Sequence, residues 1–385
     1  MSIVAARAFG RAALVGHPSD NFPEHGYDGA VLAMTLWCFH CTVQVWESPE
    51  ITICHNDRHF RSWDELLTHT ARYGIFDEEP YLRAGLSVFG HHCRTHGLAD
   101  RLDRNVSLRL LETNIPRQLG LSGSSAIVTA ATRALMQFYA ISEAEIPLTT
   151  QAWLVLQAEA EARTRGGLQD KLAQVYGAAG HGLVRMEFPA AWHGRPDGAA
   201  ARCEPLDPGL LPPLALLYYP EGAKQSHQVH SRWDILFRQG GPEFLAAVRE
   251  LPTLVPKTVA ALQQRDWDEF GRLLDRGFEL RLATCGTSAA DLEAREMCRR
   301  RGIAFNQTGS GGAGILYSPD PARIAELRRE LPEGWGLVEL TPATAWEAAS
   351  PRSLSPGKAS GGTSSTLPKA GPGAIDPRLS HPLQP

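Results

Sequence analysis

The sequence predicts an α+β protein of two domains, and three observations support this fold class. The chain has 385 residues, which is enough for two hydrophobic cores. With 43% hydrophobic and 21% charged residues, its composition is that of a globular protein. Strand-like and helix-like patterns occur in both halves, separated by a segment rich in Ala, Gly, Pro and Asp. We expect a first domain over residues 1–188, a linker or surface loop over 189–210, and a second domain over 211–350.

Hydrophobic periodicity defines the elements of the first half. Residues 3–16 predict an opening strand that ends in a loop rich in Gly, Pro, Ser and Asp. Residues 62–97 combine apolar spacings of three and four, which indicates helix. The remaining predictions are strands within 30–55, over 106–112 and over 183–188, and helices from a loop at 116–126 to about Tyr139, over 149–163 and over 166–176.

The second half opens with an apolar run over residues 214–219 that predicts a buried strand. Residues 306–314 form a glycine-rich loop that leads into a short apolar run at 315–317. The last segment, 351–385, is rich in Pro, Gly and Ser and lacks aliphatic periodicity, so we expect a disordered tail. Helical segments are predicted over 242–265, 267–281 and 289–301.

Charge and hydropathy exclude several classes of partner. The net charge of -4 and the pI of about 6.4 give no basic footprint for nucleic acid. No apolar run approaches the roughly 18–20 residues of a membrane span, and the first residues lack the apolar region of a secretory signal. Seven cysteines form an odd set without a dense framework. We therefore expect a cytoplasmic protein without nucleic-acid or membrane partners; the oligomeric state is not readable from these patterns.

Residues 120–126 form a loop of glycine and serine that opens a helix. The N–H groups at a helix N-terminus have no partner within the helix and carry about half a positive charge, so they bind phosphate. Ser124 and Ser125 add hydroxyls for a phosphate oxygen or for Mg²⁺. An ordinary turn with an N-cap is the alternative, and the lysine of a Walker A loop is absent. The candidate residues are Gly120, Leu121, Ser122, Gly123, Ser124, Ser125 and Ala126.

Two carboxylates follow this loop, and phosphoryl transfer uses two such groups. Glu159 and Asp170 are eleven residues apart, with a Gly-Gly break between them. One carboxylate holds the Mg²⁺ that neutralises the phosphates, and another group accepts or orients the proton of the acceptor hydroxyl. We assign the first role to Glu159 and the second to Asp170. The alternative is an exposed helix residue and a charge favoured by the helix dipole.

Two further motifs lie at the ends of the chain's globular part. Residues 308–314 contain four glycines in seven positions, more than a plain turn needs, and such a loop can lie against a nucleotide. Arg11 lies on the first predicted strand and can place positive charge beside Asp170. Asp20, in the loop that follows, can hydrogen-bond substrate hydroxyls. Each of these residues, taken singly, is also an ordinary strand or turn residue.

These motifs, in this order and spacing, resemble the GHMP kinase superfamily. Residues 8–11 (AFGR) followed by 16–20 (GHPSD) are similar to its first motif. Residues 116–126 resemble its phosphate loop, P-x-x-x-G-L-x-S-S-A, and are one residue longer. Residues 309–314 resemble its third motif. Within the superfamily, the chain is most similar to the plant-type glucuronokinases, through residues 114–128, 167–177 and 308–313.

The resemblance implies an ATP- and Mg²⁺-dependent kinase that phosphorylates a sugar at its anomeric carbon, in a two-domain GHMP kinase fold with the active site in the interdomain cleft. It implies that Asp170 is the base or orienting carboxylate, Arg11 its charge partner, and Asp20 a sugar contact. Ser125 and Glu159 become metal ligands. The implied ATP-phosphate and closing loops comprise Pro116, Gly120 to Ser125, Ala126, Gly309, Ser310, Gly311 and Gly312.

Substrate choice is the least determined part of this interpretation. Glucuronate is the first candidate; other sugars of the family (galacturonate, galactose, arabinose or a heptose) and a catalytically inactive sugar- or nucleotide-binding relative are the alternatives. The retained Asp170 argues against the inactive relative. His17 replaces the Glu or Asn of related sugar kinases, and residues 21–28 form a longer loop than expected. A sugar carboxylate needs a cation, for which the candidates are Arg117, Lys224 and Arg232.

Overall fold

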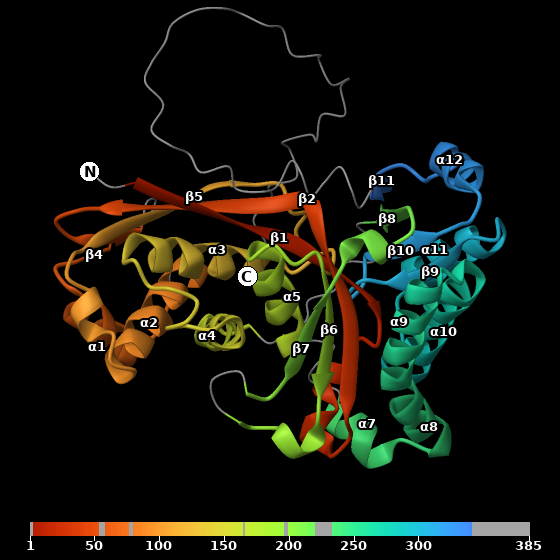
Figure 1. Cartoon of the computed structure of the whole chain (residues 1–385), viewed down its shortest axis with the longest axis horizontal. Coiled ribbons are helices and arrows are strands. Elements are labelled where there is room, and N and C mark those ends of the chain that lie inside the picture. Colours follow the sequence, from red (N-terminus) through yellow and green to blue (C-terminus); the bar gives the residue numbers. More distant parts are fainter. Residues whose placement is uncertain are drawn as a thin grey trace, which may run out of the picture. The chain divides into compact units, whose positions relative to one another are not determined.

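Two antiparallel-rich sheets, each with its own helices, make up the fold of the computed structural model (Figure 1). The first sheet is built around β1 (Ile3–Val15) and β2 (Gly29–Glu47), which pair along most of their length. The strand order is β4-β3-β5-β2-β6-β7, and β1 pairs with β2 outside this order. The structure describes residues 3–53, 58–76, 80–164, 166–195, 199–219 and 233–340.

The shorter strands of the first sheet extend it from β2 in both directions. β5 (Val106–Thr113) pairs with the second half of β2, and β6 (Leu183–Phe188) pairs with the first half. The outer strands are β3 (Ile51–Ile53), β4 (His59–Phe60) and β7 (Arg202–Leu206).

One face of this sheet is covered by a layer of helices (Figure 1). α3 and α5 contact β1 and β2 directly, and their buried alanines and aliphatic residues join the main apolar core. Each of these two helices begins just after a glycine-containing loop, so the packing of the helices fixes where those loops end. The layer comprises α1 (Trp63–Tyr73), α2 (Pro80–Thr95), α3 (Gly123–Phe138), α4 (Leu148–Glu161) and α5 (Leu168–Ala178).

The second sheet has the order β11-β8-β10-β9 and is antiparallel throughout. β9 (Ala304–Gln307) and β10 (Ala313–Tyr317) are fully buried. They are joined by the glycine-rich residues 308–312, which we call the third glycine-rich loop. β8 (Leu214–Tyr218) and β11 (Gly336–Leu340) complete it. The helices of this half are α7 (Trp233–Gln239), α8 (Pro242–Glu250), α9 (Leu254–Gln264), α10 (Trp267–Cys285), α11 (Ala289–Arg299) and α12 (Pro321–Arg329).

The predicted α+β class is confirmed, and most predicted elements are present, with three differences. Two predicted helical segments are divided: 62–97 into α1 and α2, and 242–265 into α8 and α9. Residues 189–210, expected as a linker or loop, contain β7, which pairs with β6 at the edge of the first sheet. Because β7 is largely exposed and contains Pro205, it has no apolar alternation to reveal it. The third difference is that β4, β9, β11, α7 and α12 were not predicted, and β9 includes two residues of the loop expected over 306–314.

The predicted tail, residues 351–385, lies outside the described residues. Within the described ranges, none of the helices has the length and apolarity that a bilayer crossing requires. Two sheets with separate helices agree with a two-domain organisation, and the boundaries at residues 188 and 211 stay a prediction.

Candidate active site

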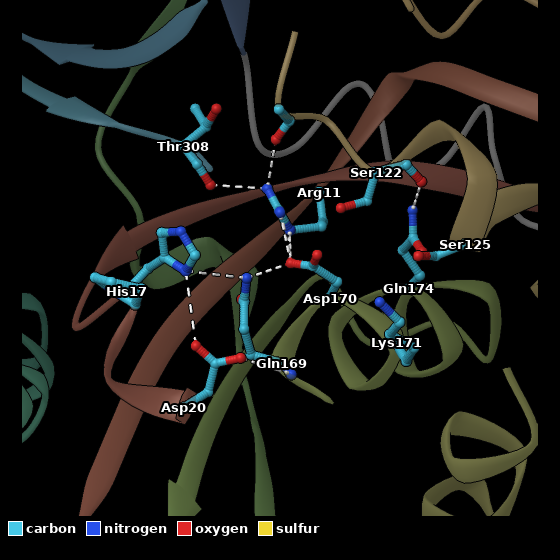
Figure 2. Close-up of polar contacts among 12 residues, drawn as sticks. Arg11, His17, Asp20, Ser122, Ser125, Gln169, Asp170, Lys171, Gln174 and Thr308 are labelled. Carbon is cyan, nitrogen blue, oxygen red and sulfur yellow. Dashed lines mark hydrogen bonds and ion pairs between the residues drawn. The ribbon is translucent and has the colours of Figure 1, made fainter. Parts of the chain in front are cut away.

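Arg11 lies at the centre of the candidate site, on β1, with only 2% of its surface exposed. Its Nε donates to Oδ1 of Asp170 at 2.7 Å, and its Nη2 lies 2.5 Å from the same oxygen. Its Nη1 donates to the backbone carbonyls of Gly120 and Thr308, at 2.7 Å in each case (Figure 2). The Arg11 guanidinium therefore connects β1 to three segments that the sequence analysis identified: the loop with Gly120, the helix start with Asp170, and the loop that begins at Thr308.

Asp170 is the third residue of α5, in the first turn, where the helix dipole favours a negative charge. Burial alone would raise the pKa of this carboxyl, but the positive charges of Arg11, Lys171 and His17 outweigh burial and lower the pKa to about 2. The amide of Gln169 also donates to Oδ1. Asp170 is therefore ionised at neutral pH and can accept a hydrogen bond from an alcohol.

The predicted phosphate loop ends inside α3, because Gly123, Ser124, Ser125 and Ala126 form the first turn of that helix. Ser122 is the N-cap and has a φ of 59°, a left-handed conformation that non-glycine residues seldom adopt. Its side chain makes no capping hydrogen bond, so it leaves the first N–H groups of α3 to other acceptors. The amide of Gln174 holds the carbonyl of Ser122 at 2.6 Å. This end of α3 suits an anionic ligand.

The second loop, which contains Gly120 and precedes α3, and the third loop, residues 308–312, lie with their backbones in direct contact. A Cβ on Gly309 would lie 2.3 Å from the carbonyl oxygen of Gly120, and a Cβ on Gly120 would lie 3.0 Å from the backbone of Ser310 and Gly311. Gly311 and Gly312 have φ of 127° and 81°. Glycine is therefore required for close approach at Gly309 and for backbone conformation at the other two positions.

Glu159 joins α4 to the start of α3 and is 3% exposed. Its Oε1 accepts hydrogen bonds from Ser124 and Ser125, at 2.6 and 2.7 Å. Its Oε2 lies 2.5 Å from Nζ of Lys171, which is 1% exposed. The structure thus brings together the two predicted metal-ligand residues, and it adds a buried lysine that the sequence analysis did not consider.

Asp20 and His17 lie at the N-terminus of α5, beside Asp170 (Figure 2). The Asp20 side chain is fully buried: Oδ2 accepts from the backbone N–H of Gln169 at 3.5 Å, and Oδ1 lies 3.7 Å from Nδ1 of His17. Burial lowers the pKa of His17, although its hydrogen bond to Asp20 acts in the opposite direction. The carboxylate predicted to contact sugar is thus also bound to the protein itself.

A cavity of about 570 Å³ opens elsewhere, between the first sheet and the helices of the second half. It is lined by residues 26–30 and Arg185 on one side, and by residues between Val248 and Pro256 on the other. None of the candidate residues lines it, so the charged cluster around Arg11 is a separate feature.

Sequence reasoning missed the residues that hold this cluster in place: Gln169, Lys171, Gln174 and Thr308. Gln169 and Lys171 flank Asp170 in α5, and Gln174 lies one turn further along the helix, on the same face as Asp170. A polar residue at each of these positions in an otherwise apolar helix was an available signal. The role of the Thr308 carbonyl has no signal in the sequence, because every residue has a backbone carbonyl.

The sequence of the chain is similar to those of known kinases. The model of the GHMP kinase N-terminal domain matches residues 88–178, which include the second loop, Glu159 and Asp170. Probable glucuronokinase 2 of Arabidopsis thaliana is 33% identical over 341 residues, covering 86% of this chain and 89% of that protein. Glucuronokinase 1 of the same plant is 34% identical over 332 residues, covering 84% and 88%.

Solved structures resemble the fold at lower identity. Phosphomevalonate kinase of Streptococcus pneumoniae superposes with a TM-score of 0.64 at 16% identity, over 88% of this chain and 98% of that one. Mevalonate kinase of Methanococcus jannaschii gives 0.63 at 15%, again over 88% and 98%. At such identities the likeness concerns the fold alone.

Proposed function

The chain belongs to the GHMP kinase family, and from this premise we propose that it transfers the γ-phosphate of ATP to the anomeric hydroxyl of a sugar acid, with glucuronate the first candidate. The two Arabidopsis relatives supply the substrate class. The observation that carries the chemistry is the Arg11 guanidinium, which holds Asp170 beside both glycine loops.

The phosphates of ATP are proposed to lie at the first turn of α3, where the N–H groups of the helix N-terminus suit an anion and where Ser124 and Ser125 hold Glu159 beside it. Gly309 to Gly312 would close over them from the second sheet, because that loop contacts Gly120. This arrangement needs no lysine in the phosphate loop.

A magnesium ion fits the residues present. Oε1 of Glu159 and Oγ of Ser125 converge within 2.7 Å of each other, and both are oxygen ligands of the kind Mg²⁺ prefers. The described residues hold no cluster of three or more His, Cys, Asp or Glu side chains; Mg²⁺ bound with nucleotide takes only one or two carboxylates and completes its shell with phosphate and water. Bound there, the ion would neutralise charge on the transferring phosphoryl group.

Asp170 is proposed to orient the acceptor hydroxyl and to stabilise the charge that develops on it. A carboxylate with a pKa of about 2 is a weak base toward an alcohol in the ground state. Phosphoryl transfer through a loose transition state asks mainly for positioning, and full deprotonation is not required early. Arg11 keeps the carboxylate ionised and fixed in direction.

The test is a panel of acceptors with ATP and Mg²⁺: glucuronate, galacturonate, galactose and mannose. We expect turnover with glucuronate and a product phosphorylated at C1 by NMR. Turnover on neutral sugars alone would remove the sugar-acid assignment and leave a kinase for another sugar. Asp170→Asn should lower kcat by about 10²–10⁴-fold while ATP binding is retained; near-full activity would contradict the role of Asp170.

We also propose that the protein works in the cytoplasm. The cysteines among the described residues are all free thiols, which agrees with a reducing compartment. Detection of the tagged protein by fractionation, with cytosolic and organelle markers, tests this assignment.

A further inference from the structure

We propose that Arg281, on α10, binds the carboxylate of the sugar acid and thereby selects acidic over neutral sugars. The inference rests on the proposed function, because it names the residue that reads the acidic group. Of the cations that the sequence suggested, Arg117 is exposed, and Lys224 and Arg232 lie outside the described residues.

Arg281 is a buried cation without a counterion among the described residues. It is 3% exposed, its Nε donates to Oε1 of Gln307, and its Nη1 has no hydrogen-bond partner. Burial of an unpaired charge is costly, and native structures avoid it unless a ligand or a partner compensates. Two other arginines differ in this respect: Arg11, which is also buried, is paired with Asp170, and the partly buried Arg295 is paired with Asp275.

The position of Arg281 links the second sheet to the acceptor side of the candidate site. Gln307, its partner, ends β9 and precedes Thr308, whose carbonyl binds Arg11. α10, which carries Arg281, also contacts β1, the strand that leads into the loop of His17, and the charge of Arg281 acts together with burial to lower the pKa of His17. His17 in turn lies against Asp20 and Gln169, next to Asp170.

This position suits the far end of a hexuronic acid. The carboxylate of the pyranose is carried on C5, which the ring oxygen separates from the anomeric C1, so its partner must lie to one side of the acceptor hydroxyl and away from the ATP phosphates. The glycine loops and Arg11 occupy the phosphate side, whereas α10, which carries Arg281, packs against β1, the strand that leads to His17. A guanidinium binds a carboxylate through two parallel hydrogen bonds, which a neutral sugar hydroxymethyl group cannot replace.

The side chain is also held in advance of binding. Gln307 accepts from Arg281 and donates through Nε2 to Thr287 at 2.9 Å, and Thr287 donates to Asp291 at 2.8 Å. The same Asp291 accepts from the N–H of Gly312 in the third loop, at 3.2 Å. A guanidinium fixed in this way loses little freedom when it binds an anion, as specificity residues require.

The experiment compares glucuronate with glucuronamide, which has the same shape without the charge, for the full-length protein and for Arg281→Met and Arg281→Lys. In Arg281→Met, kcat/KM for glucuronate should fall about 10²–10³-fold, the effect of truncating one member of a buried charge pair. The value for glucuronamide should change little, and KM for ATP should be unchanged. For Arg281→Lys, kcat/KM for glucuronate should lie between the values of wild type and Arg281→Met, because lysine keeps the positive charge but cannot form two parallel hydrogen bonds.

Arg295→Met serves as the control, because Arg295 is a partly buried arginine whose Nη1 also has no hydrogen-bond partner, but which forms an ion pair with Asp275. It should lower thermal stability and leave the glucuronate-to-glucuronamide ratio unchanged. If the wild-type protein phosphorylates sugars without preferring glucuronate, the proposed function itself fails. If wild type prefers glucuronate and Arg281→Met keeps that preference, only the role of Arg281 is wrong. A rise in KM for ATP alone would assign Arg281 to the nucleotide, and failure of both variants to fold would make it structural; either result overturns the inference.

Discussion

Arg11 and Thr308 are 297 residues apart in the chain, yet Nη1 of Arg11 donates to the carbonyl of Thr308 at 2.7 Å. The same nitrogen donates to the carbonyl of Gly120, and the Nε and Nη2 atoms of the guanidinium bind Asp170. The five N–H groups of a guanidinium have fixed directions, so these bonds set the relative positions of both glycine loops and the carboxylate. One residue of the first strand therefore organises groups from both sheets.

The first prediction concerns this arginine. Arg11→Met should destabilise the protein by about 3–5 kcal/mol, because it leaves the buried Asp170 charge without its main partner. Urea unfolding measures the change. Arg7→Met is the control on the same strand: Arg7 pairs with Glu112 at 3.2 Å, with the two side chains about half exposed, and its loss should change stability by less than about 1 kcal/mol. Equal effects of the two variants would contradict the central role of Arg11.

The second prediction is a loss of stability in acid that depends on Asp170. Its pKa is lowered from 3.8 to about 2 in the folded protein, so the pair contributes stability above about pH 4 and loses it as pH falls toward 2. The shift corresponds to about 2 kcal/mol at neutral pH. Asp170→Asn lacks this titration, so the difference in unfolding free energy between wild type and variant should shrink between pH 4 and pH 2. A difference that stays constant over this interval would show that the carboxyl has an ordinary pKa.

Much of the site could be predicted from sequence because its parts are local motifs. The glycines of the two loops, Ser125 and Asp170 are each read from a few neighbouring residues, and the start of α3 follows from the apolar period after the loop. The α+β class follows in the same way from short-range periodicity.

The remaining features depend on contacts that no short segment encodes. Lys171 meets Glu159 because α4 and α5 pack side by side, and Arg281 meets Gln307 because α10 packs against β9. Asp20, predicted as a sugar contact, has its Oδ1 beside His17, and its Oδ2 accepts from the N–H of Gln169 at the start of α5. The sequence could not indicate these pairings, since each unites segments from different elements. β7 escaped prediction for the opposite reason: an exposed edge strand needs no apolar pattern.

The third prediction tests the contact between the glycine loops. Gly309→Ala places a Cβ 2.3 Å from the carbonyl of Gly120, so the loops must separate. We expect a loss of about 1–3 kcal/mol in stability, as for other overpacked sites, and a higher KM for ATP. Gly241→Ala is the control, because a Cβ there meets nothing within 4 Å. Thermal unfolding and ATP kinetics of the two variants give the comparison; an unchanged KM for Gly309→Ala would separate the third loop from nucleotide binding.

The fourth prediction separates the two partners of Glu159. Its Oε1 faces Ser125 and its Oε2 faces Lys171, so the metal and the ammonium would use different oxygens of one carboxylate. Glu159→Gln removes the charge that a magnesium ion needs and should raise the Mg²⁺ concentration for half-maximal activity at least about 10-fold. Lys171→Met removes only the competing cation and leaves Glu159 buried and unpaired, which should cost about 3–5 kcal/mol without metal.

The two variants should therefore respond to the metal in opposite directions. Because Mg²⁺ supplies the positive charge that Lys171→Met lacks, addition of Mg²⁺ with ADP should raise the melting temperature of this variant more than that of wild type, whereas Glu159→Gln should gain less than wild type. Glu161→Gln, an exposed glutamate on the same helix, should behave as wild type. Thermal unfolding with and without Mg²⁺-ADP measures these shifts independently of catalysis. If the nucleotide stabilises Lys171→Met and Glu159→Gln equally, the ion is held elsewhere and the pairing of Glu159 with Lys171 is structural.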